Sequence, residues 1–237
     1  MARHRVNQPI ETGAAMPPST RIADSPVTES TARTRGNPAT RELIMDAALR
    51  VLDRKNIIDA TVDDIVRDAA VARGTFYIYF KDKFDVLKAL AMRENERLFA
   101  DSHANLDRAA HPYDRLRTSL RNVIRHWESH ASLFRSLTQM SLARDDFYQM
   151  DRQNRFRYIE KIRSDLDSSI ARGHAHPIDP AVAAKALAAM MDWFCLLWFA
   201  MREPPYEGAT HPAEIEHVTD HVALLWYRAV YAEDPHE

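Results

Sequence analysis

Pairs of a capping residue and a proline precede the long apolar segments of this chain. Asn37-Pro38 and Asp179-Pro180 each place an N-cap residue before a proline at the first helical position, and His111-Pro112 precedes a third segment. After each pair, apolar residues recur every three or four positions, which is the period of an amphipathic helix and not that of a strand. Only five glycines interrupt the 237 residues. The pattern predicts an all-α fold.

Charge and cysteine content limit the classes of partner and compartment. The formal net charge of −2 gives no overall attraction to nucleic acid or membrane, so a binding surface must arise from local charge placement. The single cysteine, Cys195, excludes an intrachain disulfide and fits the reducing cytoplasm. Residues 1–37 carry five arginines against three acidic residues and lack the apolar region of a signal peptide. We expect residues 1–37 to form a disordered, mildly basic arm.

The segment 181–201 is nearly as long and as apolar as a membrane-spanning helix. Lys185 and Asp192 interrupt it, and either charge is unfavourable at the centre of a bilayer. The sequence therefore predicts a helix of a soluble protein, buried on nearly all sides, and no membrane partner.

The first helices have the lengths and boundaries of a helix-turn-helix unit. A long helix is expected from Asn37-Pro38 to Lys55-Asn56, and Thr61 with Asp64 forms a capping box for a short second helix. The turn Ala70-Val71-Ala72 follows, and a further helix begins near Lys83. A long helix, a short helix, a tight turn and another short helix indicate a helix-turn-helix motif.

The stretch ARGTFYIYFKDK (72–83) combines four aromatic residues with cations and hydroxyl groups. Phe76 and Phe80 are four residues apart, so they share a helix face and are expected in the core. The outer surface then carries hydroxyl and ammonium groups suited to phosphate, Gly74 allows close approach to bases, and Arg73 suits guanine. The alternative is a solvated amphipathic helix, because residues 38–90 contain nine basic and nine acidic side chains. The outward residues are Thr75, Tyr77, Tyr79, Lys81 and Lys83.

Residues 39–90, including the capping Thr61 and the run GTFYIYFKDK, resemble the DNA-binding domain of the TetR family of bacterial transcriptional repressors. The resemblance implies a three-helix DNA-binding domain at 38–90, after the arm at 1–37, and a helical ligand-binding and dimerisation domain at 91–237. Family members typically have Gly-Val-Ser where this chain has Ala70-Val71-Ala72, so the recognition helix lacks its usual serine cap. The predicted DNA-binding residues are Thr61, Arg73, Gly74, Thr75, Tyr77, Tyr79, Lys81 and Lys83.

The second half, with SHASLF (129–134) and the closing LLWYRAVYAED, looks like the subgroup of the mycobacterial repressor of ethionamide activation. That resemblance implies a homodimer that binds a palindromic operator and is released by a lipophilic small molecule. Simple core packing is the alternative for each pocket residue. By analogy, Leu197, Val222 and Leu225 form the dimer interface, and Trp127, Tyr158, Met191 and Trp226 line the ligand pocket.

Two other classes of function are considered. The pairs His126/His130 and His217/His221 have helical i,i+4 spacing suited to zinc, and His174-Ala-His176 is a further candidate, so a metal-responsive regulator is the alternative. No cysteine or carboxylate cluster completes these sites in the sequence. An enzyme is disfavoured, because phosphate-loop, nucleophile-elbow and metal-hydrolase motifs are missing and Cys195 is expected to be a buried thiol. No cofactor is expected.

Overall fold

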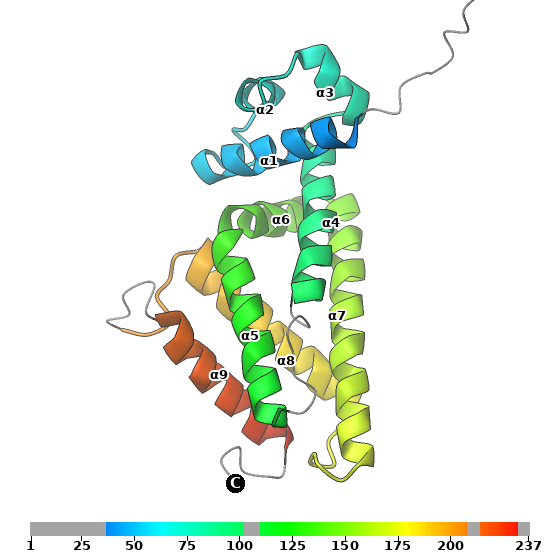
Figure 1. Cartoon of the computed structure of the whole chain (residues 1–237), viewed down its shortest axis with the longest axis vertical. Helices are drawn as coiled ribbons and strands as arrows, with labels where there is room; N and C mark the ends of the chain where they lie inside the picture. The colour runs from blue at the N-terminus through cyan, green and yellow to red at the C-terminus, as the bar shows by residue number, and fades with distance from the viewer. Residues whose placement is uncertain (1–36, 102–109, 208–213, 232–237) are drawn as a thin grey trace, which may run out of the picture. The chain divides into compact units, whose positions relative to one another are not determined.

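Helices make up most of residues 37–101, 110–207 and 214–231, which are the residues that the computed structural model describes. Within these ranges the chain is all-α, which confirms the predicted fold class (Figure 1). Its elements are α1 (Pro38–Arg54), α2 (Val62–Asp68), α3 (Arg73–Tyr79), α4 (Lys83–Asp101), α5 (Pro112–Ser129), α6 (Ala131–Ala143), α7 (Asp145–Ala171), α8 (Pro180–Cys195), the π-helical segment η1 (Leu196–Ala200) and α9 (Glu214–Val230).

The cap-and-proline pairs start helices where the sequence predicts them. Asn37 Oδ1 accepts a hydrogen bond from the Ala39 amide at 3.0 Å, and Asp179 Oδ1 accepts one from the Ala181 amide at 2.9 Å. His111 caps α5 in the same way, through Nδ1. These bonds satisfy amides that a helix leaves without internal partners. Residues 1–36 of the arm predicted at 1–37 lie outside the described residues, as does the predicted start of the last helix at His211.

The helices α1 to α3 pack around an apolar centre, and α4 leads from them to the remaining helices (Figure 1). α4 contacts α1 on one side and α5, α6 and α7 on the other. A single cluster of buried apolar side chains continues through both halves, and Gly36–Glu237 form one compact unit. Residues 90 and 91 lie inside α4, so the division into two domains at this point stays a prediction.

In the second half, α7 packs on α6 and α8, while α9 packs on α5. Ionic contacts reinforce the α5–α9 pair: Arg121 Nε lies 2.9 Å from Glu216 Oε2, and Arg117 pairs with Asp220. Gly173, at φ +76°, follows the last turn of α7 and donates its amide to the Ile170 carbonyl, as expected of a helix-ending glycine.

The expectation that segment 181–201 is buried on nearly all sides is wrong. Pro180–Ala200 is long and apolar enough to cross a membrane, but it is not buried on nearly all sides, since 44% of its most apolar window lies inside the protein. One side of α8 forms core through Ala184, Ala188 and Met191, and Trp193 on the other side is 58% exposed. Phe156 of α7 is likewise 62% exposed. The helical periodicity identified the helices but not the sides left for solvent or a partner.

Candidate nucleic-acid interface

The second helix of the motif begins at the predicted capping box. Thr61 Oγ1 accepts a hydrogen bond from the Asp64 amide at 3.1 Å, and Asp64 Oδ2 accepts one from the Thr61 amide at 3.0 Å. The Lys55 ammonium, 2.8 Å from Asp64, and the Thr61 hydroxyl hold the pKa of Asp64 well below its usual range. Thr61 therefore has a structural role as the partner of Asp64, and its contact with DNA stays a prediction.

The turn between α2 and α3 contains an unusual backbone conformation. Ala70 lies at φ +52°, in the left-handed region that favours glycine. The next helix, α3, begins at Arg73, and its N-cap residue Ala72 makes no capping bond through its side chain. The structure therefore confirms that α3 lacks a side-chain cap at its N-terminus.

α3 is fixed to the core by the two phenylalanines that the periodicity assigns there. Phe76 is fully buried and Phe80 nearly so, and their ring centroids lie 5.9 Å apart. Tyr77 is 48% exposed, and its ring lies edge-on to that of Phe76 with 5.4 Å between the centroids. Arg73 and Gly74 are exposed beside it, as predicted.

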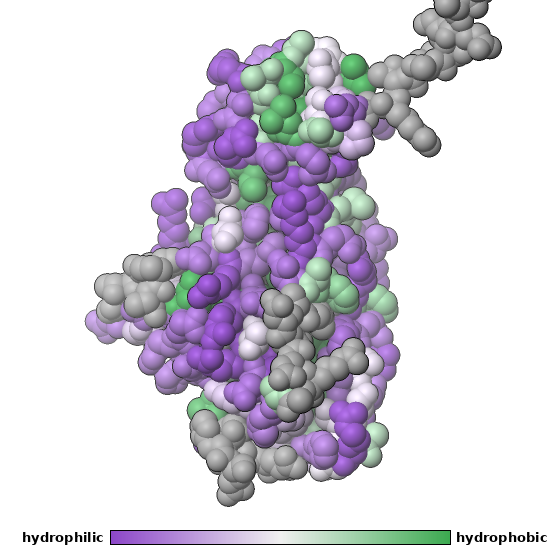
Figure 2. All heavy atoms as spheres, in the orientation of Figure 1, coloured by the Kyte–Doolittle hydropathy of each residue, from purple (hydrophilic) through white to green (hydrophobic). Residues whose placement is uncertain are grey.

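The exposed side of α3 carries a small polar group. Arg73 Nη1 lies 2.5 Å from Asp63 Oδ1, and Nη2 lies 3.3 Å from the Tyr77 hydroxyl oxygen. These two partners, the Tyr77 hydroxyl first, raise the pKa of Arg73. Figure 2 shows hydrophobic side chains among hydrophilic ones at the surface of the α1–α3 region. The exposed apolar residues there include Ile58 and Ile78, and the sequence did not point to either as part of this surface.

The remaining predicted residues do not all face outward. Thr75 and Tyr79 are half-buried, and Tyr79 packs against the apolar core. Lys83 Nζ donates to the carbonyl oxygens of Ile58 and Ala60 at 2.8 and 2.7 Å. Lys81 is exposed. The predicted set of outward residues is therefore too large, because helical periodicity does not include contacts with other segments such as the loop before α2.

The predicted pocket residues lie in or near the core. Trp127, Met191 and Trp226 are buried, and Trp127 stacks on Phe134 with 4.1 Å between ring centroids. Tyr158 is half-buried, and its surroundings raise its pKa through desolvation. Two hollows of about 350 and 390 Å³ lie near Glu128, and none of the four predicted residues lines either one.

The predicted interface residues differ in exposure. Leu225 on α9 is 61% exposed, while Leu197 and Val222 are half-buried. Trp193 and Val182, on the outer side of α8, are also exposed. α8 and α9 therefore both present apolar side chains at the surface of the chain.

The histidine pairs fall into two groups. His217 and His221 are exposed, as are His174 and His176, and among the described residues no third ligand completes either pair. His126 and His130 instead lie beside Glu94 of α4. Burial, with a smaller effect of His130, lowers the pKa of His126 to about 4. Glu94 lies 32 positions before His126, and no sequence pattern indicates that the two residues meet.

Comparisons with known proteins agree with this geometry. The family model described as "Bacterial regulatory proteins, tetR family" matches residues 44–90. The HTH-type transcriptional regulator SrpR of Pseudomonas putida is 47% identical over 57 residues, but the match spans only 24% of this chain and 27% of SrpR. EthR of Mycobacterium tuberculosis, also an HTH-type transcriptional regulator, is 26% identical over 220 residues, which cover 90% of this chain and 96% of EthR.

A solved structure extends the likeness in fold. The fatty acid degradation regulator FadR from Bacillus halodurans superposes with a TM-score of 0.67 at 21% identity, over 81% of this chain and 96% of FadR. The helix-turn-helix end and the helical second half thus occur together in a known regulator fold.

Proposed function

The chain belongs to the TetR family of transcriptional regulators, which are not enzymes and are typically repressors, and from this premise we propose that it is a cytoplasmic, homodimeric repressor that binds a palindromic operator through α3. We further propose that a lipophilic small molecule releases it from DNA.

The observation that carries DNA binding is the division of α3 between core and surface. Phe76 and Phe80 fix the helix, so Arg73 and Tyr77 are held at the surface on a rigid support. Guanidinium and hydroxyl groups suit phosphate oxygens and guanine. Arg73 pairs with Asp63 in free protein, and operator phosphate or a base would replace that carboxylate. Gly74 has no heavy atom within 4 Å of an added Cβ, so the space beside it is open to DNA.

Lys83 enters this proposal in a positioning role as well as a DNA-contacting one. Its bonds to the Ile58 and Ala60 carbonyls join the start of α4 to the loop before α2. A second contact, to phosphate, is available only if the ammonium keeps one of its three donors free.

Dimerisation is supported by the apolar side chains that α8 and α9 leave at the surface. Val182, Trp193 and Leu225 are each more than half exposed, which is unfavourable for a monomer in water. A two-fold axis beside these helices buries the same patch of both copies. Two recognition helices about 34–36 Å apart would then reach successive major grooves of the operator.

The effector is proposed to enter the second half between packed aromatic residues. Trp127, Met191 and Trp226 are buried and apolar, so a ligand that took the place of their packing contacts would be largely apolar. Such a ligand releases DNA only if it binds more tightly to a conformation with another separation of the recognition helices. Its differential affinity sets the size of the effect.

A gel-shift titration on the palindrome nearest the gene tests DNA binding. Tyr77→Ala is expected to weaken binding about tenfold, as for loss of a contact that contributes 1–3 kcal/mol. Tyr148→Ala is the matched control, because Tyr148 is an equally exposed tyrosine on α7. If neither the wild type nor the control shifts the fragment, or if Tyr77→Ala binds as the wild type does, the proposal is wrong.

Light scattering after gel filtration tests the dimer. Leu225→Asp is expected to give monomers, and Leu142→Asp, at an exposed leucine of α6, is expected to stay dimeric. Native mass spectrometry of the purified dimer tests the effector. A highly charged co-purified molecule in the second half would contradict the lipophilic class.

A further inference from the structure

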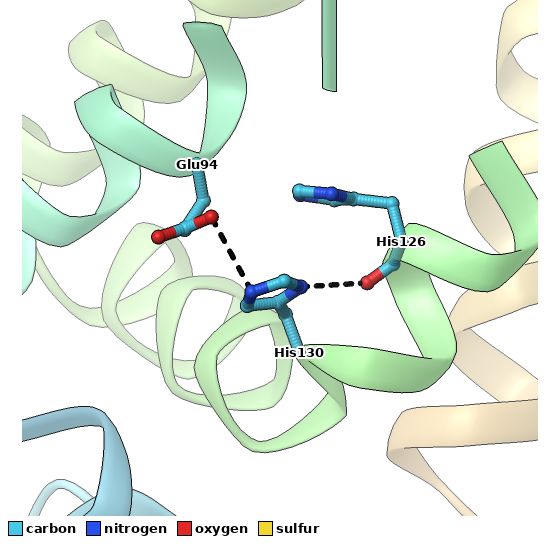
Figure 3. A group of neighbouring side chains, drawn as sticks. All are labelled: Glu94, His126 and His130. Carbon is cyan, nitrogen blue, oxygen red and sulfur yellow. Dashed lines mark hydrogen bonds and ion pairs between the residues drawn. The ribbon is translucent and has the colours of Figure 1, made fainter. Parts of the chain in front are cut away.

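Three side chains with metal-binding atoms meet where α4, α5 and α6 come together (Figure 3). Glu94 comes from α4, His126 from the last turn of α5, and His130 from the junction of α5 and α6. Their ligand atoms all lie within 4.8 Å of one another. Glu94 is 1% exposed, His126 is also buried, and His130 is half-buried.

The hydrogen bonds leave electron pairs facing one another in this cluster. His130 Nδ1 lies 2.9 Å from the His126 carbonyl oxygen (Figure 3). A carbonyl only accepts, so Nδ1 carries the proton and Nε2 of a neutral ring has a free lone pair. That Nε2 lies 3.3 Å from Glu94 Oε2. Among the described residues, neither Glu94 Oε2 nor His126 Nε2 has a hydrogen-bond partner.

Buried acceptors without donors are unfavourable, and a cation between them removes the penalty. We propose that Glu94, His126 and His130 bind one divalent first-row transition metal ion of the Zn²⁺ type. Two imidazole nitrogens and one carboxylate oxygen, without sulfur, favour such an ion over Cu(I) or Ca²⁺. Three protein ligands leave a further position for water.

The distances require a small adjustment of side chains. Ligand bonds of about 2.1 Å in a tetrahedron place ligand atoms about 3.4 Å apart. The separations are at most 4.8 Å, so they must shorten by no more than about 1.4 Å, which rotation of the glutamate and histidine side chains supplies.

The groups around the ligands have the arrangement of an outer shell. The His126 carbonyl orients the His130 ring, as a backbone acceptor commonly does for a metal-binding histidine. Arg93 Nε and Arg97 Nη1 hold Glu94 Oε1 at 2.8 and 3.0 Å, which leaves Oε2 for the ion. The two guanidinium charges also repel a cation, so we expect weaker binding than at a structural zinc site.

The site is connected to the DNA-binding unit by one side chain. Arg93, which holds Glu94, also places Nη1 2.8 Å from Glu42 Oε2 and 2.8 Å from Asp46 Oδ1, both on α1. A metal ion that draws Glu94 toward the histidines changes the carboxylate on one side of this guanidinium. Metal binding would thereby shift α4 relative to α1. This regulatory consequence rests on the proposed DNA binding, whereas the metal site itself does not.

Zinc binding is tested on the full chain without a histidine tag, after chelator treatment and equilibrium dialysis against ZnCl₂. The wild type is expected to hold one Zn²⁺ per chain, and His130→Gln to lose at least tenfold in affinity. The control is the double variant His217→Gln, His221→Gln. That pair has the same i,i+4 spacing and the same Nδ1–carbonyl contact at 2.9 Å, but no carboxylate within the described part of the chain completes it.

Circular dichroism and the melting temperature show whether each variant folds. Zn²⁺ at about 100 times its Kd should raise the melting temperature of the wild type by about 5 °C or more, and that of folded His130→Gln hardly at all. Stoichiometric zinc in the folded His130→Gln variant, or none in the wild type, would overturn the site. In the second case a protonated His130 paired with Glu94 accounts for the cluster.

Gel shifts with and without Zn²⁺ test the regulatory consequence. We expect operator affinity to change at least fivefold in the wild type and not in His130→Gln. Metal-loaded protein with unchanged operator affinity would overturn the regulatory link and leave the site standing. Metal binding without any DNA binding would refute the proposed function instead.

Discussion

Ala70→Gly is expected to stabilise the protein, because Ala70 lies at φ +52° in the turn before the recognition helix. A residue with a Cβ loses about 1–2 kcal/mol in this conformation relative to the right-handed one, and glycine does not. Glycine also makes the unfolded chain more flexible, which takes back about 0.4–1 kcal/mol. Ala70 is exposed, so removal of its methyl group loses little packing. The net gain is about 0.5–1 kcal/mol, or about 1–4 °C in melting temperature for a chain of this size.

Urea unfolding followed by circular dichroism, at one protein concentration, measures this gain. Ala72→Gly is the matched control, since Ala72 is an exposed alanine in the same turn with φ −69°. It should change the free energy of unfolding little, because the flexibility that glycine adds is offset by its advantage over alanine as an N-cap residue. If Ala70→Gly is no more stable than Ala72→Gly, the left-handed conformation is not a source of strain and the reasoning fails.

Three further predictions concern stability. Ala72→Ser supplies the missing cap of α3 and should add about 0.5–2 kcal/mol to the free energy of unfolding, measured in urea. Lys83→Met removes the donor to the Ile58 and Ala60 carbonyls and should lower the free energy of unfolding by about 1–3 kcal/mol. The control Lys81→Met should lower it little. If Lys83→Met binds the operator more weakly at unchanged stability, Lys83 is a DNA contact only. Burial raises the pKa of Asp192 from 3.8 to about 6, so the folded state binds this proton more tightly than the unfolded state, and the wild type loses stability as the pH rises from about 4 to about 6. Asp192→Asn should avoid that loss and be more stable than the wild type above pH 6, by at most about 3 kcal/mol. In melting curves recorded at several pH values, the difference should vanish below pH 4. An equal difference above pH 6 and below pH 4 would refute the raised pKa of Asp192.

The starts of α1, α2 and α8 could be predicted because their signals are local. Asn37, Thr61 and Asp179 each bond an amide two or three residues ahead, and such contacts are encoded within one turn of sequence. Periodicity likewise assigned Phe76 to the core. The side of α8 that stays exposed is not a local property, because it depends on which helix packs against it.

Two features of the candidate sites needed the tertiary structure for the same reason. Lys83 bonds carbonyls 23 and 25 residues away, so a helical wheel placed it with the outward residues. Glu94 lies on a different helix from His126 and His130, so its position in the sequence does not indicate that it lies beside them. Both contacts form between segments that come together only on folding, and no sequence pattern around these residues predicts which residues they contact.

These two contacts also bear on how an effector would act. α4 is tied to the DNA-binding unit at its first residue by Lys83 and, about three turns later, by Arg93 on Glu42 and Asp46. Because α4 is held at these two points, a shift of α4 would move α1 and the loop before α2 together. A lipophilic ligand in the second half and a metal ion at Glu94 would then act on the same helix. Because coupling between bound ligands is reciprocal, each would change the affinity of the other, and titration of zinc with and without the effector measures that change directly.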